Sequence, residues 1–326
     1  MSTGRAAAAE RHLVVGVDGG GTSTRCVVAT VSGEVVGRGH AGGANILSAV
    51  DPVGSLRAAL AEALHDHDAT RVAGGVFALA GAEAAGERAP AAAGEVWRRL
   101  RLSGAPEVVS DLAAAFSGAT EEPSGTVLIA GTGAVAARIA DRRVTRRADG
   151  HGYLLGDEGS GVWIGRRAVQ AVLAALEGRA VPTALLAAVT ALPGAPENPT
   201  PGEIVRLVHA GLADAGPAWL GRLAPAVEAA ARAGDNTALA IVEDAAERLT
   251  ATLRSLGPAD GPTVLAGSLL TEPTLLADEV RARLAGAALV PARDSAAGAA
   301  ALALHALALH ALDLPDAPAA HRRLIG

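Results

Sequence analysis

The stretch HLVVGVDGGGTSTRCVVATV, residues 12–31, decides the fold. It opens with a short, valine-rich apolar run that favours a buried strand over a helix. Three glycines at 19–21 interrupt the run, and RCVVATV then predicts a second strand. After a Ser-Gly turn, EVVGRGH (34–40) predicts a third. The opening is therefore an antiparallel three-stranded meander, unlike a nucleotide-binding βαβ unit, whose glycine turn leads straight into a helix.

The same arrangement begins again at Gly125. GTVLIAG predicts an apolar strand that ends in a Gly-Thr-Gly turn, and AVAARIADRRVTRRA (134–148) predicts two further strands. Elsewhere helical and strand patterns alternate, as in an α/β sheet with crossover helices, and 163–256 is mostly helical with a proline-rich break at 193–201. The expected helices are 52–65, 89–102, 236–256, 273–284 and 296–313, and the expected strands are 71–79, 107–110, 263–266 and 287–291. The sequence therefore predicts two topologically similar halves.

Composition limits what the protein can do. The chain has 326 residues, half of them hydrophobic, which suits a two-domain protein with a sizeable core. A net charge of −6 and only 2% aromatic residues disfavour a nucleic-acid partner, because such binding needs excess positive charge and stacking platforms. All 28 basic residues are arginine. A Walker-type phosphate loop, a protein-kinase site and Schiff-base chemistry are excluded, since each needs a lysine.

Cysteine content and apolar runs bear on location. The single cysteine, Cys26, excludes an internal disulfide framework and a zinc site built from several cysteines, so a reducing, cytoplasmic location is the expectation. Residues 1–11 read as a disordered leader. The apolar run 296–312 is shorter than the roughly 20 residues that a membrane span needs, so we expect a buried terminal helix and no membrane partner.

The first glycine turn has the residue types of a phosphate site. Glycines let the backbone N–H groups approach a phosphate, and the hydroxyls that follow add donors. Asp18, at the end of the strand, could hold Mg²⁺ through water. The turn and its hydroxyls are Gly19, Gly20, Gly21, Thr22, Ser23 and Thr24. A second candidate turn is Gly131, Thr132 and Gly133, and an ordinary tight turn remains the alternative for both.

Two carboxylates and an asparagine are further candidates. Asp111 follows a predicted strand, where a carboxylate could accept a hydroxyl proton, and Asp157 lies in GDEGSG, where it could bind adjacent sugar hydroxyls. The alternative for both is a helix cap. Asn45 lies in a glycine-rich loop and could equally be a turn residue. Two histidine groups carry no metal expectation: HDHD at 65–68 reads as a solvated helix end with no assigned role for His65 and His67, and His305 and His310 lie on different helix faces.

Five ordered motifs carry a family resemblance. They are VDGGGTSTR, VVSDLAAAFSGA, TVLIAGTGA, GYLLGDEGSGVWIGRRA and TVLAGSLL, which together cover about residues 13–312. In this order they resemble the BadF/BadG/BcrA/BcrD ATPase family and its N-acetylglucosamine kinase branch, within the actin-like ATPase superfamily of sugar kinases and Hsp70. The resemblance implies two ribonuclease-H-like α/β domains around a central cleft.

The resemblance also implies roles for individual residues. By it, Asp18 organises Mg²⁺, Gly19 to Thr22 lie under the β- and γ-phosphates of ATP, and Asp111 is the general base. The implied second phosphate turn is Gly131 to Gly133, with Thr132 and Gly133 also near the sugar, and Gly267 lies beside the adenosine. The sugar-binding residues implied are Asn45, Gly156 and Asp157. Ala80 and His151 depart from a serine and a tryptophan of that branch, which alters the wall around the sugar 2-substituent.

The implied activity is phosphorylation of an amino sugar, most directly N-acetylglucosamine at its 6-hydroxyl with Mg²⁺ and ATP. Three alternatives stay open: a glucosamine kinase, a non-catalytic sugar sensor, and an ATPase that activates a dehydratase. The last needs cysteines for an iron–sulfur cluster, and this chain has one. The kinase branch is commonly dimeric, so a homodimer is an expectation.

The resemblance gives domain limits as well. The N-terminal ribonuclease-H-like domain is expected over 12–118, completed by the C-terminal helix 296–313. The C-terminal ribonuclease-H-like domain is expected over 119–295, with a helical insertion.

Overall fold

The computed structural model describes most of the chain: residues 12–258, 260–310 and 316–326. The leader expected at residues 1–11 lies outside the described residues, as do residues 311–313 of the expected terminal helix.

The chain forms two compact units. Of the described residues, the first contains 12–125, 139–145 and those from 292 onward, and the second contains those within 126–138 and 146–291. The described residues form two five-stranded sheets, the first in one unit and most of the second in the other, so the predicted α/β class with two similar halves is confirmed.

In the first unit the strand order is β3-β2-β1-β4-β5. The strands are β1 (Leu13–Gly19), β2 (Ser23–Thr30), β3 (Val35–Gly42), β4 (Val72–Leu79) and β5 (Pro106–Ser110). The pairs β1–β2 and β2–β3 are antiparallel, which confirms the predicted meander. β1, β4 and β5 run parallel, with Gly19 opposite Leu79 and Leu79 opposite Ser110. The carboxyl ends of these three strands therefore meet at one edge of the sheet.

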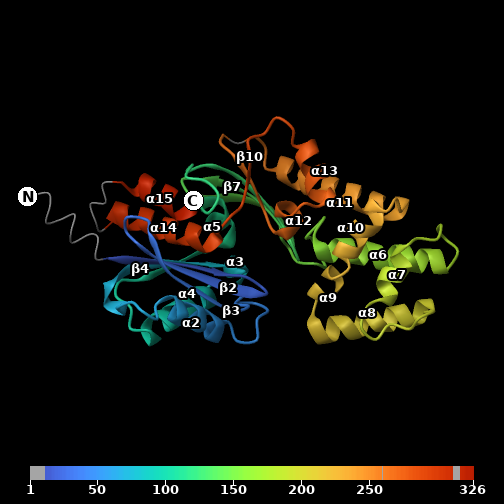
Figure 1. The fold of residues 1–326 in the computed structure, drawn as a ribbon, viewed down its shortest axis with the longest axis horizontal. Helices are drawn as coiled ribbons and strands as arrows, with labels where there is room; N and C mark the ends of the chain where they lie inside the picture. The colour runs from blue at the N-terminus through green and yellow to red at the C-terminus, as the bar shows by residue number, and fades with distance from the viewer. Residues whose placement is uncertain (1–11, 259, 311–315) are drawn as a thin grey trace, which may run out of the picture. The chain divides into compact units, whose positions relative to one another are not determined.

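Helices cover both faces of this sheet, with α2 and α4 on one side and α14 and α15 on the other (Figure 1). They are α2 (Pro52–Ala63), α3 (Ala82–Ala85), α4 (Arg88–Arg99), α5 (Asp111–Ser117), α14 (Ser295–His310) and α15 (Ala317–Ile325), with a 3-10 turn, η1, at Ala69–Arg71. Alternate residues of β1 serve the two cores, because Val15 and Val17 belong to one apolar cluster and Val14 to the other. Helix α15 is absent from the elements expected from the sequence.

The alanine-rich helix α14 lies directly on β1. A Cβ atom at Gly16 would lie 2.1 Å from the Ala296 carbonyl oxygen and 2.2 Å from the Ala300 nitrogen. Only glycine allows so close an approach of helix and strand. Ala296 to Leu304 are all buried, which confirms the predicted burial of this helix for these residues. Within the described residues, no helix is long and apolar enough to cross a membrane.

The second unit repeats the strand order of the first. Its sheet runs β10-β9-β6-β7-β8, with β6 parallel to β9 and β9 parallel to β10. The strands are β6 (Gly125–Ala130), β7 (Ala134–Ala140), β8 (Arg143–Asp149), β9 (Thr263–Ala266) and β10 (Leu289–Pro291). β6 thus occupies the central position that β1 has in the first sheet. β7 and β8 lie on one side of it, and the parallel strands β9 and β10 lie on the other. Residues 139–145, at one end of β7 and β8, group with the first unit.

The rest of the second unit is mostly helical, as predicted (Figure 1). The helices are α6 (Gly161–Leu176), α7 (Leu185–Thr190), α8 (Pro201–Ala215), α9 (Ala218–Gly221), α10 (Ala224–Arg232), α11 (Asn236–Ser255), α12 (Ser268–Thr271) and α13 (Leu275–Arg283). One apolar core joins them to the sheet and includes Trp163 and Trp219. The predicted long helix is α11, which Asp235 caps, and the proline-rich break falls between α7 and α8.

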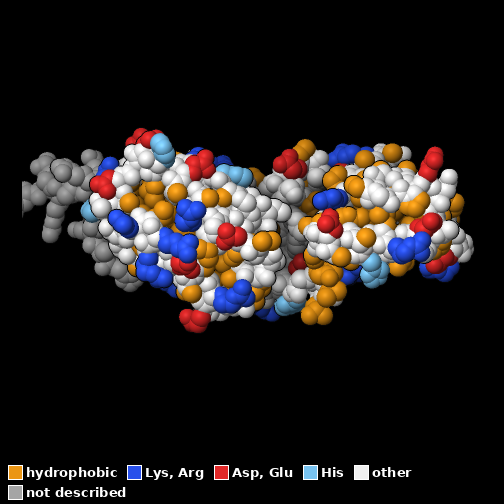
Figure 2. Space-filling view, turned by 90° about the horizontal axis from the view of Figure 1, so that it is seen from below, with side chains coloured by type: hydrophobic (Ala, Val, Ile, Leu, Met, Phe, Trp, Pro, Cys, Tyr) orange, Lys and Arg blue, Asp and Glu red, His pale blue; other side chains and the backbone are white. Residues whose placement is uncertain are grey.

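The surface carries both signs of charge. On the face shown in Figure 2, arginine and acidic side chains are interspersed among apolar ones. Several arginines pair with carboxylates on neighbouring turns of the same helix, for example Arg99 with Glu95 at 2.5 Å. Such exposed pairs contribute little to stability individually, about 0.2–1 kcal/mol.

Candidate active site

The glycine turn after β1 is a tight loop held from behind. Gly20 donates its N–H to the Ser23 carbonyl (3.0 Å), and its own carbonyl accepts from the backbone N–H groups of Ala44 (2.9 Å) and Asn45 (3.0 Å). A Cβ atom at Gly43 would lie 2.2 Å from the Gly21 carbonyl oxygen, so the two loops are in direct backbone contact. Gly21 and Thr22 remain exposed at the tip. The turn therefore presents backbone to solvent at the edge where β1 ends.

Asp18 is a buried carboxylate beside this turn. Its side chain is 13% exposed, and Arg25 on β2 donates a hydrogen bond from Nη2 to its Oδ2 at 2.9 Å. Burial raises the pKa of Asp18 to about 6, Arg25 opposes the rise, and the negative charges of Asp111 and Asp294 add to it. Two further carboxylates are thus close enough to affect Asp18. A group of acidic oxygens with one exposed arginine fits a hydrated divalent cation.

Asp111 lies at the same edge of the first sheet. Because Ser110 is in register with Leu79 and Leu79 with Gly19, the residue after β5 is level with the turn after β1. Ser110 is the N-cap of α5, and Asp111 is the first helical residue. Its Oδ1 accepts hydrogen bonds from the Leu112 N–H (3.1 Å) and the Ser110 hydroxyl (3.3 Å). The N-cap residue of α5 is therefore Ser110 and not Asp111.

Asn45 forms a turn and lies next to the same edge. Its Oδ1 accepts from the backbone N–H groups of Leu47 (2.9 Å) and Ser48 (3.3 Å). The neighbouring Ala80 donates its N–H to the Gly19 carbonyl at 3.0 Å. A Cβ atom at Gly81 would lie 3.3 Å from Asn45 Oδ1, so the Asn45 side chain lies beside the chain after β4. Asn45 and Ala80 are thus gathered with Asp18 and Asp111 in the first unit.

The Gly-Thr-Gly turn of the second unit is tied to a helix instead of a loop. Gly131 donates its N–H to the Gly133 carbonyl at 2.9 Å, and the Gly131 carbonyl accepts from the Gly161 N–H at 2.8 Å. Thr132 is exposed, and its carbonyl accepts from the Val162 N–H at 3.3 Å. The turn is therefore held by the first residues of α6.

Asp157 lies against this turn. A Cβ atom at Gly133 would lie 2.7 Å from Asp157 Oδ2, and Asp157 Oδ1 accepts from the Gly152 N–H at 3.3 Å. Burial raises the pKa of Asp157, hydrogen bonding from Gly152 opposes the rise, and the Asp149 charge adds to it. Ser160, whose hydroxyl accepts from the Trp163 N–H at 3.2 Å, caps α6. The N-cap residue of α6 is therefore Ser160 and not Asp157.

Three other predicted residues have distinct surroundings. Gly156 is buried with room for hydrogen only, because a Cβ there would lie 2.1 Å from Asp149 Oδ1 and 3.1 Å from the Cβ of His151. His151 is exposed on the same loop. Gly267 adopts φ +84° before α12, and a Cβ there would lie 2.2 Å from the Ala130 carbonyl oxygen. Gly267 thus lies next to the end of β6, where the Gly-Thr-Gly turn begins.

The sequence reasoning missed two residues that hold the Asp157 loop. Asp149 accepts backbone hydrogen bonds from Asp157 and Glu158, each at 2.8 Å. Arg248 on α11 forms an ion pair with Glu158 and stacks on Trp163, with 5.1 Å between the guanidinium and the ring centroid. The Asp-Gly dipeptide at 149–150 signals a turn, but no local signal indicates a partner on α11.

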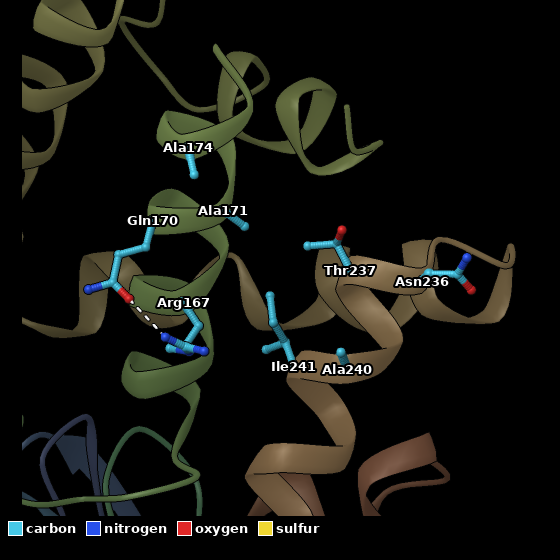
Figure 3. A pocket seen from close by; sticks show the side chains of 8 residues that line it. All are labelled: Arg167, Gln170, Ala171, Ala174, Asn236, Thr237, Ala240 and Ile241. Carbon is cyan, nitrogen blue, oxygen red and sulfur yellow. Dashed lines mark hydrogen bonds between the residues drawn. The ribbon is translucent and has the colours of Figure 1, made fainter. Parts of the chain in front are cut away.

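A groove between α6 and α11 holds none of the predicted residues. It has a volume of about 460 Å³, and Figure 3 shows Arg167 and Gln170 on α6 across from Thr237 and Ile241 on α11. Arg167 donates a hydrogen bond to Gln170 at 3.4 Å. We therefore assign no function to this groove.

The remaining histidines and the cysteine form no metal centre within residues 12–258, 260–310 and 316–326. His65 bonds to the exposed Asp66, and His67 bonds to the Val36 carbonyl at 3.0 Å. His305 bonds through Nε2 to His321 Nδ1 at 3.1 Å. Cys26 is buried in β2, and burial raises the pKa of its thiol, which disfavours the thiolate that a cluster ligand requires.

Comparisons with known proteins agree with the motif order. A model of the BadF/BadG/BcrA/BcrD ATPase family matches residues 15–303. An N-acetylmuramic acid/N-acetylglucosamine kinase of Clostridium acetobutylicum is 28% identical over 178 residues, which are 53% of this chain and 57% of that protein. A glucosamine kinase of Vibrio cholerae is 31% identical over 179 residues, 51% of this chain and 56% of that protein. The match spans little more than half the length of these two relatives.

Solved structures resemble the chain over most of its length. A Chromobacterium violaceum protein, provisionally assigned as an N-acetylglucosamine kinase, is 28% identical with a TM-score of 0.70, covering 89% of this chain and 98% of that one. A ROK family glucokinase from Streptomyces griseus, in complex with glucose and AMPPNP, is 22% identical with a TM-score of 0.54, covering 90% and 99%. At that identity the second likeness concerns the fold alone.

Proposed function

This chain belongs to the BadF/BadG/BcrA/BcrD ATPase family, and from that premise we propose that it is an ATP-dependent amino-sugar kinase. The substrate we propose is N-acetylglucosamine, phosphorylated on its 6-hydroxyl. The observation that carries the proposal is the level alignment of β1, β4 and β5, which gathers Asp18, the glycine turn and Asp111 at one edge of the first sheet. A carboxylate for a cation, a backbone cradle and a base are the parts that phosphoryl transfer needs.

The nucleotide end of the reaction uses Asp18 and the glycine turns. Asp18 would hold Mg²⁺ through water, and its burial near Asp111 and Asp294 gives the negative charge that such a cation offsets. When bound, Mg²⁺ neutralises phosphate charge. The exposed backbone of Gly21 and Thr22 would contact the phosphates of ATP, and Gly131 to Gly133 would supply the second phosphate turn. Gly267 has no side chain to obstruct the adenosine proposed beside it.

The transfer itself uses Asp111 as general base. Its carboxylate accepts the proton of the sugar 6-hydroxyl as that oxygen bonds to the γ-phosphorus. The bond from this phosphorus to the bridging oxygen breaks, and ADP leaves with the electron pair. Ser110 and the Leu112 N–H fix Asp111 Oδ1, so the group stays oriented between turnovers.

The sugar end uses Asp157 and Asn45 as hydrogen-bonding partners for hydroxyl groups, with Thr132 and Gly133 beside Asp157. Ala80 and His151 would border the 2-substituent. The second candidate activity is glucosamine phosphorylation, which the 31% identity to the Vibrio cholerae glucosamine kinase favours. Ala80 and the exposed His151 would set the preference between the acetylated and the free amine.

The test is a coupled ADP-release assay with Mg²⁺ and ATP over N-acetylglucosamine, glucosamine, N-acetylmannosamine and glucose, with phosphorus NMR of the product. We expect one of the first two sugars to give the highest kcat/KM and a 6-phosphate product. Matched reactions without sugar measure background ATP hydrolysis. No turnover of any amino sugar by folded protein that binds ATP would overturn the proposal in favour of a sugar sensor.

A further inference from the structure

The loop from Asp149 to Glu158 is folded around one carboxylate. Asp149 Oδ1 accepts from the Gly150 N–H at 2.7 Å and from the Asp157 N–H at 2.8 Å. Its Oδ2 accepts from the Glu158 N–H at 2.8 Å. One side chain at the end of β8 thus satisfies three backbone donors, two of them eight and nine residues further along the chain. Hydrogen bonds to an ionised acceptor are stronger than neutral ones.

These bonds hold a backbone that non-glycine residues disfavour. Asp149 has φ +61° and Asp157 has φ +55°, both in the left-handed region. Gly156, between them in the loop, leaves space for the carboxylate, because a Cβ there would lie 2.1 Å from Asp149 Oδ1. The left-handed conformation of Asp157 therefore depends on contacts made elsewhere in the loop, and Asp149 makes those nearest to it.

The conformation matters because it sets where the Asp157 carboxylate lies. With φ at +55°, Asp157 has its Oδ2 against the Gly133 backbone and its Oδ1 on the Gly152 N–H. An extended backbone at this residue would direct the side chain elsewhere. On the other flank, the ion pair of Glu158 with Arg248 ties the loop to α11.

We propose that Asp149 is a positioning residue of the sugar site, which holds Asp157 in the left-handed conformation that places its carboxylate beside the Gly-Thr-Gly turn. The inference rests on the proposed function, in which Asp157 binds sugar hydroxyls. Asp149 acts through Asp157 and the backbone, without touching the substrate.

The test compares Asp149→Asn with a matched control, Asp141→Asn. Asparagine has the same shape and tolerates the left-handed region, but its NH₂ group would replace one acceptor oxygen and face a backbone N–H. Asp141 has φ +49° at the turn between β7 and β8, so the control makes the same chemical change in the same backbone region. We expect Asp149→Asn to raise the sugar KM about tenfold to a hundredfold, the value of one charged hydrogen bond, while the ATP KM stays within about twofold.

A pH profile separates positioning from simple loss of structure. The charged groups around Asp157 are Asp149, Arg147 and Glu158 with its partner Arg248, and His151 lies on the same loop. The Asp149 charge is one cause of the raised pKa of Asp157, so its removal lowers that pKa. The acid limb of kcat/KM for sugar should move to lower pH in Asp149→Asn and stay in place in Asp141→Asn.

Hydrogen exchange gives a readout that does not depend on activity. We expect faster exchange of the Asp157 and Glu158 amides in Asp149→Asn, and the unchanged rate in the control. Gly156→Ala should do the same through steric displacement of the Asp149 carboxylate, which covers the case in which Asp149→Asn does not fold.

Failures of the two proposals are distinguishable. Active wild type with an Asp149→Asn variant that keeps its sugar KM, pH profile and amide exchange overturns the positioning role and leaves the kinase intact. Wild type that neither binds nor phosphorylates an amino sugar overturns the kinase, and the positioning role with it, even if exchange shows that Asp149 holds the loop.

Discussion

The two glycine turns occupy the same place in two sheets of the same strand order, yet their surroundings differ. The first follows Asp18 and is backed by the loop at 43–45, whereas the second follows Ala130 and is backed by the start of α6. The strand before the first turn therefore supplies a carboxylate, Asp18. The second obtains one, Asp157, from a loop that another aspartate holds.

This difference shows that two sheets of the same topology can present different chemical groups beside equivalent turns. The first unit gathers Asp18 and Asp111 at one sheet edge, which suits cation binding and proton transfer. In the second unit the Gly-Thr-Gly turn lies against the Asp157 carboxylate, which suits recognition of hydroxyls. Variants that affect one turn should therefore change different kinetic constants from variants that affect the other.

The largest effect is expected in the first unit, at Asp111. Asp111→Asn should lower kcat about 10²- to 10⁴-fold, because the general base is lost while Ser110 still caps α5. Sugar binding should be retained. Stopped-flow or coupled assays measure kcat, and activity equal to that of the wild type would remove Asp111 as the base.

Asp18→Asn should weaken Mg²⁺-dependent turnover and also stabilise the fold. The pKa of Asp18 is raised to about 6, so its ionised form is less favourable in the folded than in the unfolded chain above that pH. Asparagine removes this cost, and the free energy of unfolding should rise by up to about 3 kcal/mol at pH 7.5.

The gain from Asp18→Asn should shrink as pH falls from 6 toward 4, where the wild-type carboxyl is protonated in the folded state. Asp66→Asn is the control, since Asp66 is 86% exposed. Chemical denaturation at several pH values measures the difference. A variant less stable than the wild type at pH 7.5 would contradict the burial argument.

In the second unit, Gly133→Ala and Gly131→Ala form a matched pair. A Cβ at Gly133 would lie 2.7 Å from Asp157 Oδ2, whereas a Cβ at Gly131 meets nothing within 4 Å. Overpacking of about 1–2 kcal/mol should weaken sugar binding about fivefold to thirtyfold in Gly133→Ala. Calorimetric titration with sugar measures this. Equal loss in both variants would show that the contact with Asp157 is not what matters.

The smallest effect concerns stability of the first unit in acid. His321 donates from Nε2 to the Ser117 carbonyl at 2.7 Å, so its Nδ1 accepts from His305. Burial lowers the pKa of His305 to about 4 and lowers that of His321 as well. Since the unfolded histidines bind protons near pH 6.5, stability should fall by about 1 kcal/mol between pH 7 and 5.

His321→Gln should reduce this pH dependence, because it removes one of the two buried imidazoles, while His65→Gln, at an 83% exposed site, should keep it. Thermal unfolding monitored by circular dichroism across the pH range measures both. The account is wrong here if all three proteins show the same slope.

The sequence predicted the strands well where burial dictates residue type. The valine-rich runs of β1 and β2 could only be buried, and the repeated strand-turn-strand pattern at Gly125 predicted the second sheet. Helix α15 was not predicted, because it is short and because its contact with the rest of the unit, His321 with Ser117, joins residues far apart in the chain. Its cap, Asp316, with Pro318 two residues later, was the available signal.

The candidate site was predictable only in part for the same reason. Glycine turns, carboxylates at strand ends and the GDEGSG string are visible in local sequence, so Asp18, Asp111 and Asp157 could be chosen. The role of Asp149 depends on left-handed backbone at two residues and on bonds across the loop, which residue types alone do not reveal. The helix caps were also not predictable from residue type alone. Ser110 and Ser160 are the N-cap residues, although Asp111 and Asp157 were the candidates.

The most direct test of the central claim measures sugar affinity of Asp111→Asn and Asp157→Asn side by side, by calorimetry with a non-hydrolysable ATP analogue and the sugar preferred in the kinase assay. The account predicts that Asp111→Asn binds sugar within about threefold of the wild type, whereas Asp157→Asn binds at least about tenfold more weakly, the loss expected for a charged hydrogen bond. The reverse order, or an equal loss in both variants, would contradict the division of work between the two units.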